Sequence, residues 1–221
     1  MNGVVTLTRT QESRTEEARV RLVSAALQMF AMRGYEQVSL ADISVHAGYS
    51  RALAGYHFGS KAALASHILT QIGERDMKLS LLPGADVPGE VAWALLLAHA
   101  EASWANLSRI HSDCEHGLSA RGEMLLRAAA MYSPDPALRE TFAAVGRRLT
   151  QRVAQTLDLC RRDGVISLDR DAGAAATFYV MSIWGLLSAL YVDPKAARQI
   201  DASFGVLRQF LESLYVAGGK S

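Results

Sequence analysis

The chain has 221 residues, of which 50% are apolar and 20% are charged, a balance typical of a folded protein and not of a disordered one. Its 23 Lys and Arg residues nearly match its 22 Asp and Glu residues, so the formal net charge of +1 excludes a strongly basic nucleic-acid binder. The two cysteines give no disulfide framework and the first residues form no secretory signal, so we expect a cytoplasmic protein.

The polar residues 1–13 are expected to be a flexible N-terminal arm, and the first helix is predicted over residues 15–33. Apolar residues recur there at helical spacing and define one face for burial: Val20, Val23, Leu27 and Phe30. Gly34 is expected to end this helix because glycine readily takes the left-handed conformation of helix C-termini.

A short second helix is predicted to begin at Leu40. Ser39 is a favoured N-cap residue, and Asp42 stands three positions later, where the acid of a capping box is found. Ile43 lies one turn after the N-cap on the apolar face. Gly48 then permits a tight turn.

A third short helix is expected to start at Arg51 with Ser50 as its N-cap. Gly59 and Ser60 end it before a longer helix opens with Lys61. Two short helices around a glycine turn form the corner that places the second helix in a major groove of DNA. Many such corners bind nothing, so the spacing by itself leaves a purely structural corner open.

Residues 22–64 resemble the amino-terminal domain of TetR-family transcriptional regulators. The matching residues are Ala26, Phe30, Gly34, Tyr35, Ser39, Leu40, Asp42, Ile43, Ala47, Gly48, Ser50, Arg51, His57, Phe58, Ser60, Lys61 and Leu64. The chain departs from the family pattern at two positions. Ala52 stands where the family usually has Gly, and Gly55 stands where it usually has the Tyr that contacts the DNA backbone.

The resemblance implies an all-α chain of about nine helices in two parts. Residues 1–60 would be a three-helix, helix-turn-helix DNA-binding domain, and residues 61–221 would be a helical ligand-binding and dimerisation domain. The resemblance also implies a homodimer that binds a palindromic operator, with no enzymatic activity and no cofactor.

The candidate DNA-binding residues are Ser39, Ser50, Arg51, Leu53, Tyr56, His57 and Lys61. Arg51 is suited to bidentate bonds with guanine or to a phosphate, and Leu53 to the methyl group of thymine. The polar groups of Tyr56, His57 and Lys61 suit phosphate oxygens. For Tyr56 the competing interpretation is that its ring packs against the first helix.

Further helices are predicted over residues 61–79, 89–108, 117–132 and 137–163, with a Pro- and Gly-rich linker at residues 83–89. The helix over residues 61–79 is expected to connect the two parts of the chain. Between Asp171 and Asp193 lie 21 uncharged residues, which are long enough to span a membrane.

We prefer to assign this uncharged segment to a subunit interface. It holds many small residues, and acidic residues flank it in place of Lys or Arg. A last helix over residues 195–216 carries Ile200, Phe204, Leu207 and Leu211 at helical spacing. A homodimer through residues of about 169–192 and 195–216 is therefore expected, and a monomeric core helix remains the alternative.

The middle helices supply aromatic, Met and polar residues of the kinds that line ligand pockets. The candidates are Trp93, His99, Trp104, Met124, Arg127, Met131, Phe178, Met181 and Trp184. Each of them taken singly is better explained as a core residue, and only the family resemblance groups them as an effector cavity. The apolar walls and near-neutral charge favour a lipophilic ligand.

The residues His111, Cys114, Glu115 and His116 lie close together, yet their spacing matches no standard zinc finger, and we interpret them as a solvated loop. The chain also lacks the common nucleophile, phosphate-loop and metalloprotease motifs. The sequence therefore favours a ligand-responsive, DNA-binding repressor. The alternative is a helical small-molecule-binding or membrane-associated protein whose helix-turn-helix corner is structural only.

Overall fold

The computed structural model of the chain describes residues 11–79, 87–108 and 114–216. Within these ranges the fold is all-α, as predicted. Its nine α-helices are α1 (Gln11–Arg33), α2 (Leu40–His46), α3 (Leu53–Phe58), α4 (Lys61–Leu79), α5 (Gly89–Ser108), α6 (Cys114–Met131), α7 (Pro136–Arg162), α8 (Ala172–Val192) and α9 (Ala197–Leu214), with a 3₁₀ turn (Pro194–Ala196) before the last.

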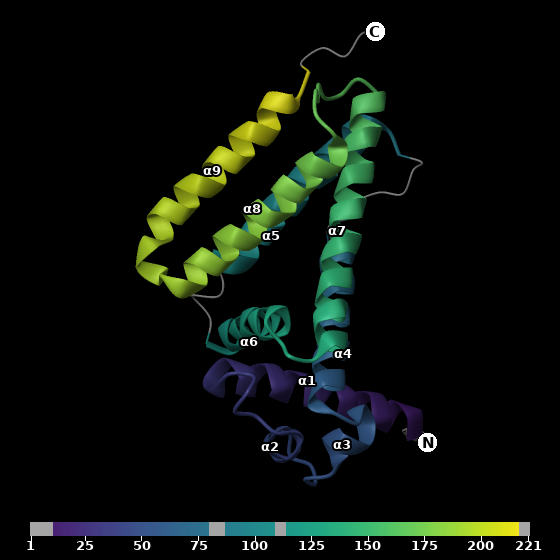
Figure 1. Cartoon of the computed structure of the whole chain (residues 1–221), viewed down its shortest axis with the longest axis vertical. Helices are drawn as coiled ribbons and strands as arrows, with labels where there is room; N and C mark the ends of the chain where they lie inside the picture. The colour runs from purple at the N-terminus through teal and green to yellow at the C-terminus, as the bar shows by residue number, and fades with distance from the viewer. Residues whose placement is uncertain (1–10, 80–86, 109–113, 217–221) are drawn as a thin grey trace, which may run out of the picture.

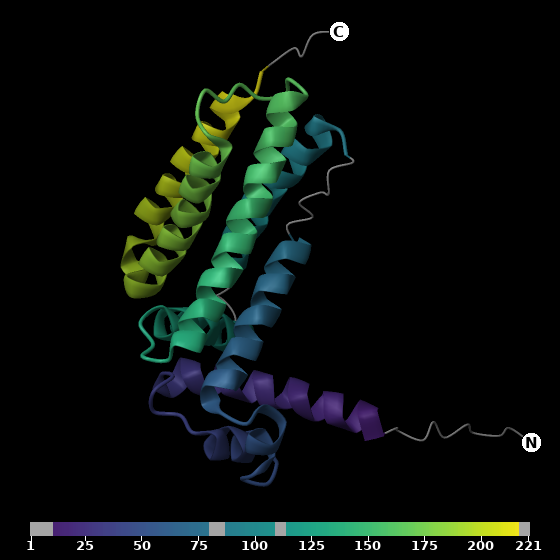
Figure 2. The ribbon, with the colours of Figure 1, turned by 45° about the vertical axis from the view of Figure 1, so that its right-hand side comes forward.

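The helices form two groups joined by α4, α6 and α7 (Figure 1). Helices α1, α2 and α3 lie at one end of the molecule, and α5, α8 and α9 lie at the other. Helix α4 leaves the first group and runs beside α7 (Figure 2), while α6 lies crosswise and contacts α1, α4, α7 and α8. This arrangement makes α4, α6 and the first part of α7 the contacts between the helix-turn-helix and the rest of the chain.

The first hydrophobic core lies under α1, α2 and α3. Fully buried Leu22, Phe30 and Ile43 pack there with Leu64 and Ile68 of α4. Helices α6 and α7 complete this core with Leu126, Ala130 and Leu138. Because these residues lie far beyond residue 61, the core crosses the predicted boundary between residues 60 and 61, and the division into two domains there stays a prediction.

Helix α1 differs from its prediction at its start and on one face. It begins at Gln11, so residues 11–13 are helical and do not belong to a flexible arm; residues 1–10 lie outside the described ranges. Val20 was expected in the buried stripe but is 60% exposed. The buried face is instead centred on Leu22, Ala26 and Phe30, because α6 covers α1 from that side.

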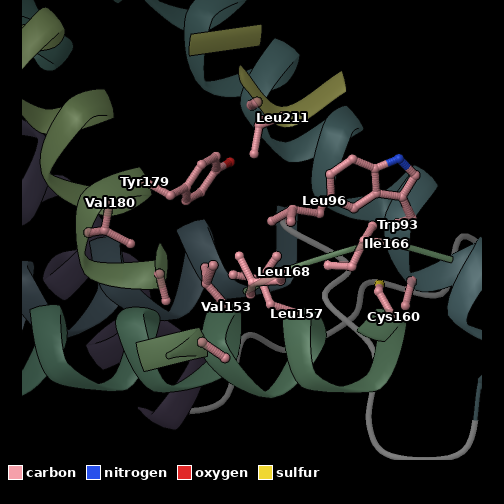
Figure 3. Packing of buried hydrophobic residues seen from close by; sticks show 14 of the residues in the cluster. Trp93, Leu96, Val153, Leu157, Cys160, Ile166, Leu168, Tyr179, Val180 and Leu211 are labelled. Carbon is pink, nitrogen blue, oxygen red and sulfur yellow. The ribbon is translucent and has the colours of Figure 1, made fainter. Parts of the chain in front are cut away.

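The second hydrophobic core lies among α5, α7, α8 and α9. Figure 3 shows Trp93 and Tyr179 apart in this core, with Leu96 between them in the view. Asp135 caps α7 through its Oδ1, which accepts a hydrogen bond from the amide of Ala137 at 2.8 Å. Asp171 caps α8 in the same way through the amide of Ala174. These caps explain why both helices begin where the sequence places them.

Candidate nucleic-acid interface

Helix α2 is held by the predicted capping box. The Ser39 hydroxyl oxygen accepts from the amide of Asp42 at 3.1 Å, and Asp42 Oδ2 accepts from the Ser39 amide at 3.1 Å. The Ser39 hydroxyl also donates to Asp42 Oδ2 at 2.6 Å, and these hydrogen bonds from Ser39 lower the pKa of Asp42 below its ordinary value of 3.8. Ser39 is therefore primarily the cap of α2, and both of its donors point to Asp42.

The turn between α2 and α3 is fixed by glycine and by one buried serine. Gly48 has a φ of 81°, a conformation that L side chains rarely adopt. The fully buried hydroxyl of Ser44 donates to the carbonyl of Leu40 at 3.0 Å and accepts from the amide of Ala54 at 2.9 Å. Ser44 thus links α2 directly to α3. Sequence reasoning missed this residue, although a serine on the buried face of a short helix was a usable signal.

The predicted N-cap of α3 is wrong. The helix begins at Leu53, its N-cap is Ala52, and no side chain caps it. Ser50 is exposed, and its backbone carbonyl accepts from the amide of Leu53 at 3.0 Å. Residues 51 and 52 form a turn, so the chain enters α3 two residues later than a serine cap would require.

Two candidate DNA ligands extend from this corner into solvent. Arg51 is exposed, and Tyr56 is 84% exposed, which excludes the interpretation that the Tyr56 ring packs against α1. The half-buried ring of His57 meets the Tyr56 ring edge to face, with centroids 5.3 Å apart. Leu53 is partly buried and packs against the first core. Arg51, Tyr56 and His57 therefore form the exposed polar side of the corner.

Lys61 has a structural task that the sequence did not predict. Its ammonium group donates to the carbonyl of Tyr35 at 2.9 Å and to that of Glu36 at 3.2 Å, and it lies 4.5 Å from the centroid of the Tyr35 ring. Burial, aided by the charge of Glu36, raises the pKa of Tyr35 to about 12. Lys61 joins the start of α4 to the turn after α1, so a phosphate contact would use the one N–H that these bonds leave.

Of the candidate ligand residues on α5, two are buried in the subunit and one contacts α9. Trp93 is buried in the second core. His99 is 7% exposed, and its Nδ1 lies 2.6 Å from the hydroxyl of Tyr179. Trp104 donates to Asp201 at 3.0 Å and stacks on Phe204. Burial lowers the pKa of His99 below its usual 6.5, against the opposing effect of the Asp76 carboxylate.

A second group of candidates surrounds Arg127 on α6. The guanidinium donates to Asp76 Oδ2 at 2.8 Å and lies 5.7 Å from the centroid of the Trp184 ring. Trp184 packs in turn on Phe142, with ring centroids 5.4 Å apart. Met124 is half-buried on the same helix as Arg127. The structure therefore brings Arg127 and Trp184 together, as a common effector region requires.

Three candidate pocket residues face outward. Met131 is 46% exposed at the end of α6, and on α8 Phe178 is 53% and Met181 48% exposed. Phe178 meets Phe210 of α9 edge to face, with centroids 5.3 Å apart. In this structure they lie outside the interior of the subunit. The physical reason is that α8 is apolar on all sides, so its sequence does not distinguish the inner face from the outer one.

The outer surface of α8 and α9 is an exposed apolar face, which we define by Phe178, Met181, Val206 and Phe210. Residues 172–190 of α8 are long and apolar enough to cross a membrane by length and composition, and 28% of the apolar window is buried. In the described ranges, no group of three or more His, Cys, Asp or Glu residues is placed to hold a metal ion. His111 lies outside those ranges, as do the side chains of Cys114, Glu115 and His116.

Comparison with known proteins gives a local match in sequence and a match over nearly the whole chain in fold. Residues 22–68 match the model of the family described as bacterial regulatory proteins, tetR family. A 66-residue segment is 36% identical to the HTH-type transcriptional regulator TtgR of Pseudomonas putida, covering 30% of this chain and 31% of that protein. The match thus spans about a third of the length of this curated relative.

Solved structures resemble the chain along most of its length. The complex of SmeT with triclosan has a TM-score of 0.74 at 23% identity and covers 92% of this chain and 93% of that one. SmeT is the repressor of a Stenotrophomonas maltophilia multidrug efflux pump. A transcriptional regulator from Saccharomonospora viridis in complex with choline has a TM-score of 0.69 at 22% identity, covering 91% of this chain and 99% of that one.

Proposed function

Because this chain belongs to the TetR family of bacterial regulatory proteins, we propose that it is a ligand-responsive transcriptional repressor that binds a palindromic DNA operator as a homodimer. The observation that carries the proposal is the helix-turn-helix corner itself. It is capped at Ser39, locked by Ser44, and leaves Arg51 and Tyr56 free in solvent. Both residues belong to the same corner, and their side chains are of the kinds that contact phosphates and base edges.

We expect the exposed residues of the corner to make different kinds of contact with DNA. Arg51 is suited to a base edge or a phosphate, while the Tyr56 hydroxyl and the His57 ring suit phosphate oxygens and fix the register on the duplex. Ser50, next to Arg51, is exposed and open to a phosphate. The chain carries little excess positive charge, so specificity has to come from these placed contacts and from two copies acting together.

The exposed apolar face of α8 and α9 supports the dimer. Phe178, Met181, Val206 and Phe210 lie on two adjacent helices and are exposed, and the Phe178 and Phe210 rings are in contact. Obligate interfaces bury apolar side chains of this kind. A two-fold axis there would pair the same two helices of both subunits. The two α3 helices would then enter successive major grooves about 34–36 Å apart.

The effector is proposed to bind among α4, α5, α6 and α8, where Arg127, Trp184 and His99 lie. A ligand there would change the position of α4 and hence the separation of the two α3 helices, with a coupling of about 1–3 kcal/mol. The structural neighbours include complexes with triclosan and with choline, so these two compounds are the first probes. We favour the lipophilic one because most of the candidate pocket residues are aromatic residues or methionines.

Selection from a random-sequence DNA pool tests the proposal. We expect the purified chain to enrich a palindrome with half-site centres one helical turn apart, which we call the selected operator. Binding should weaken with rising salt, and R51A should weaken it at every salt concentration. The control is R161A, since Arg161 is an exposed arginine of α7 on the far part of the chain. Enrichment of no sequence would contradict the regulator.

The ligand-responsive part needs its own measurement. Affinity for the selected operator is measured with and without triclosan, and then with choline. A fall in operator affinity with either compound supports the effector site. If the compound no longer lowers the affinity of W184F, the site lies near Trp184. Equal affinities with these probes and with a wider panel of lipophilic compounds would contradict it.

The alternative, a membrane-associated protein, depends on α8 alone. Much of α8 faces outward, and a lipid-facing helix and a subunit interface both explain that exposure. We infer the interface, and with it a protein located in the cytoplasm, because the apolar face extends onto α9, which carries charged Arg208 and Glu212. Recovery of the dimer without detergent supports this inference, whereas a requirement for detergent favours the membrane.

A further inference from the structure

Gly55 lies in the middle of α3 at a position where the fold does not require glycine. Its φ is not positive, in contrast to those of Gly48 and Gly59, so the backbone there suits any residue of helical preference. A Cβ atom added to Gly55 would meet no surrounding atom of the described chain within 4 Å. Glycine inside a helix is less stable than alanine because it loses more conformational freedom on folding. The packing of this chain therefore does not account for Gly55.

Gly55 lies on the outward side of α3. Ala52 precedes Gly55 by three residues and Tyr56 by four, and it already has helical backbone angles, so the three residues lie on one side of the helix. Ala52 is exposed and Tyr56 is 84% exposed, whereas Ala54 on the opposite side is fully buried. Helix α3 itself lies at the outer end of the molecule (Figure 1). A duplex that meets α3 would therefore meet the side that carries Gly55.

Ala52 and Gly55 leave a strip of this side without polar side chains. Neither residue has a side-chain donor or acceptor. The nearby amides are already hydrogen-bonded: that of Leu53 to the carbonyl of Ser50 at 3.0 Å, and that of Tyr56 to the carbonyl of Ala52 at 2.9 Å. A phosphate needs donors, so this strip suits a small apolar group better than it suits the DNA backbone.

The small apolar group on the base edges of the major groove is the C5 methyl group of thymine. Leu53 was the residue expected to contact it, but the Leu53 side chain is partly buried and packs against the first core. The strip of Ala52 and Gly55 is on the exposed side and lies between the longer side chains of Arg51 and Tyr56. With no side chain at residue 55, a base edge can come close to the helix backbone while both longer side chains reach polar groups beside it.

We propose that Ala52 and Gly55 are specificity-determining residues that hold the C5 methyl group of one thymine in each operator half-site. The proposal rests on the proposed function and deepens it by naming a base that the corner recognises. It also explains the glycine, because a Cβ atom at residue 55 would occupy the place of the methyl group. Helix stability and DNA recognition then make opposite demands on this position.

The first arm of the test changes only the DNA. Each thymine of the selected operator is replaced in turn by deoxyuridine, which lacks the methyl group and keeps the same base pairing. We expect one thymine per half-site to stand out, with operator affinity about four-fold lower after its replacement, the effect of one buried methyl group. We call it the contact thymine.

The second arm changes residue 55. We expect G55A to bind the selected operator at least ten-fold more weakly than the wild type does, because the new Cβ and the methyl group compete for one space. The four-fold penalty for deoxyuridine at the contact thymine should disappear in G55A. The melting temperature of G55A should not fall, since alanine is the better helix former and its Cβ has room.

The matched control is G205A. Gly205 lies in α9, and a Cβ atom there would also meet nothing within 4 Å. This variant should keep both the wild-type affinity and the four-fold deoxyuridine penalty, which shows that a helical glycine-to-alanine change has no general effect on binding.

Three results would overturn the proposal. One is a wild type that binds every deoxyuridine operator as tightly as the thymine operator. Another is G55A with wild-type affinity or with an undiminished deoxyuridine penalty. The third is a lower melting temperature of G55A, since Gly55 would then have a structural role. Failure of the wild-type chain to bind any duplex would instead remove the proposed function.

Discussion

Two tyrosines of nearly equal exposure allow the effect of a DNA contact to be distinguished from the effect of removing any exposed tyrosine. Tyr56 on α3 is 84% exposed, and Tyr132 just after α6 is 82% exposed. Neither ring contributes a buried surface whose loss would destabilise the chain. Only Tyr56 lies on the corner that we assign to DNA.

We expect Y56A to lower operator affinity about ten-fold, or ~1.4 kcal/mol, because it removes one hydrogen bond to a charged phosphate. The matched variant Y132A should bind as the wild type does. Fluorescence anisotropy with the selected operator measures both affinities, and thermal melting should be unchanged in both. Equal affinities for the two variants would remove Tyr56 from the interface.

His99 gives the molecule a pH dependence of stability. Burial lowers the pKa of His99 in the folded chain below its usual 6.5, whereas unfolding exposes the ring and restores that value. The unfolded state therefore binds more protons between the two pKa values, and the free energy of unfolding rises with pH across that window. Above 6.5 this contribution is constant.

We expect urea denaturation to show lower stability at about pH 5.5 than at about pH 7.5 in the wild type, with a smaller difference in H99Q. The glutamine side chain of that variant would keep a polar group beside the Tyr179 hydroxyl but carries no titrating proton. Identical pH dependence in the two proteins would show that other groups dominate this range.

At the scale of the element, α2 and α3 differ in how they begin. Ser39 exchanges hydrogen bonds with Asp42, whereas Ser50 lies before a turn and makes no cap. We expect S39A to cost about 1 kcal/mol of the free energy of unfolding, and S50A to cost almost nothing. The S39A variant should also return the pKa of Asp42 toward 3.8, since the hydroxyl hydrogen bond is its largest cause of depression.

Chemical denaturation of the two variants measures the first effect, and NMR titration of the Asp42 carboxyl measures the second. A similar loss of stability in S39A and S50A would show that α3 also depends on a serine cap in solution.

The whole molecule is expected to work only as a pair. We predict that F178E converts the dimer to a monomer, because a carboxylate on the exposed apolar face of α8 and α9 would be buried in the interface without a partner. Operator affinity should fall with it, since one subunit contacts one half-site only. Sedimentation velocity measures the mass.

V20E is the matched control for F178E. Val20 is 60% exposed on α1, away from α8 and α9, so V20E should stay dimeric. A dimeric F178E would place the subunit interface elsewhere.

The features that the sequence by itself determined are those encoded by residues close together in the chain. The order and type of the helices, the capping box at Ser39 and Asp42, and the turn at Gly48 follow from local hydrogen bonds and backbone preferences. The match to the helix-turn-helix family also lies in one continuous segment, residues 22–68. Among these local features, the predictions were wrong at helix ends: α1 begins earlier than predicted, at Gln11, and α3 begins later, at Leu53.

Only the tertiary structure decided which partners these residues meet. In the sequence, Lys61 is a candidate phosphate ligand. In the structure its ammonium group donates to the carbonyls of Tyr35 and Glu36, which lie 26 and 25 residues earlier in the chain. Phe178 and Tyr179 are neighbours in one apolar helix, yet one is half exposed and the other is buried against His99. Gly122 looks like an ordinary helix-weakening glycine until α1 is placed beside it. The physical reason is that helical periodicity specifies a face but not its partner, and the partner is chosen by packing between segments far apart in the chain.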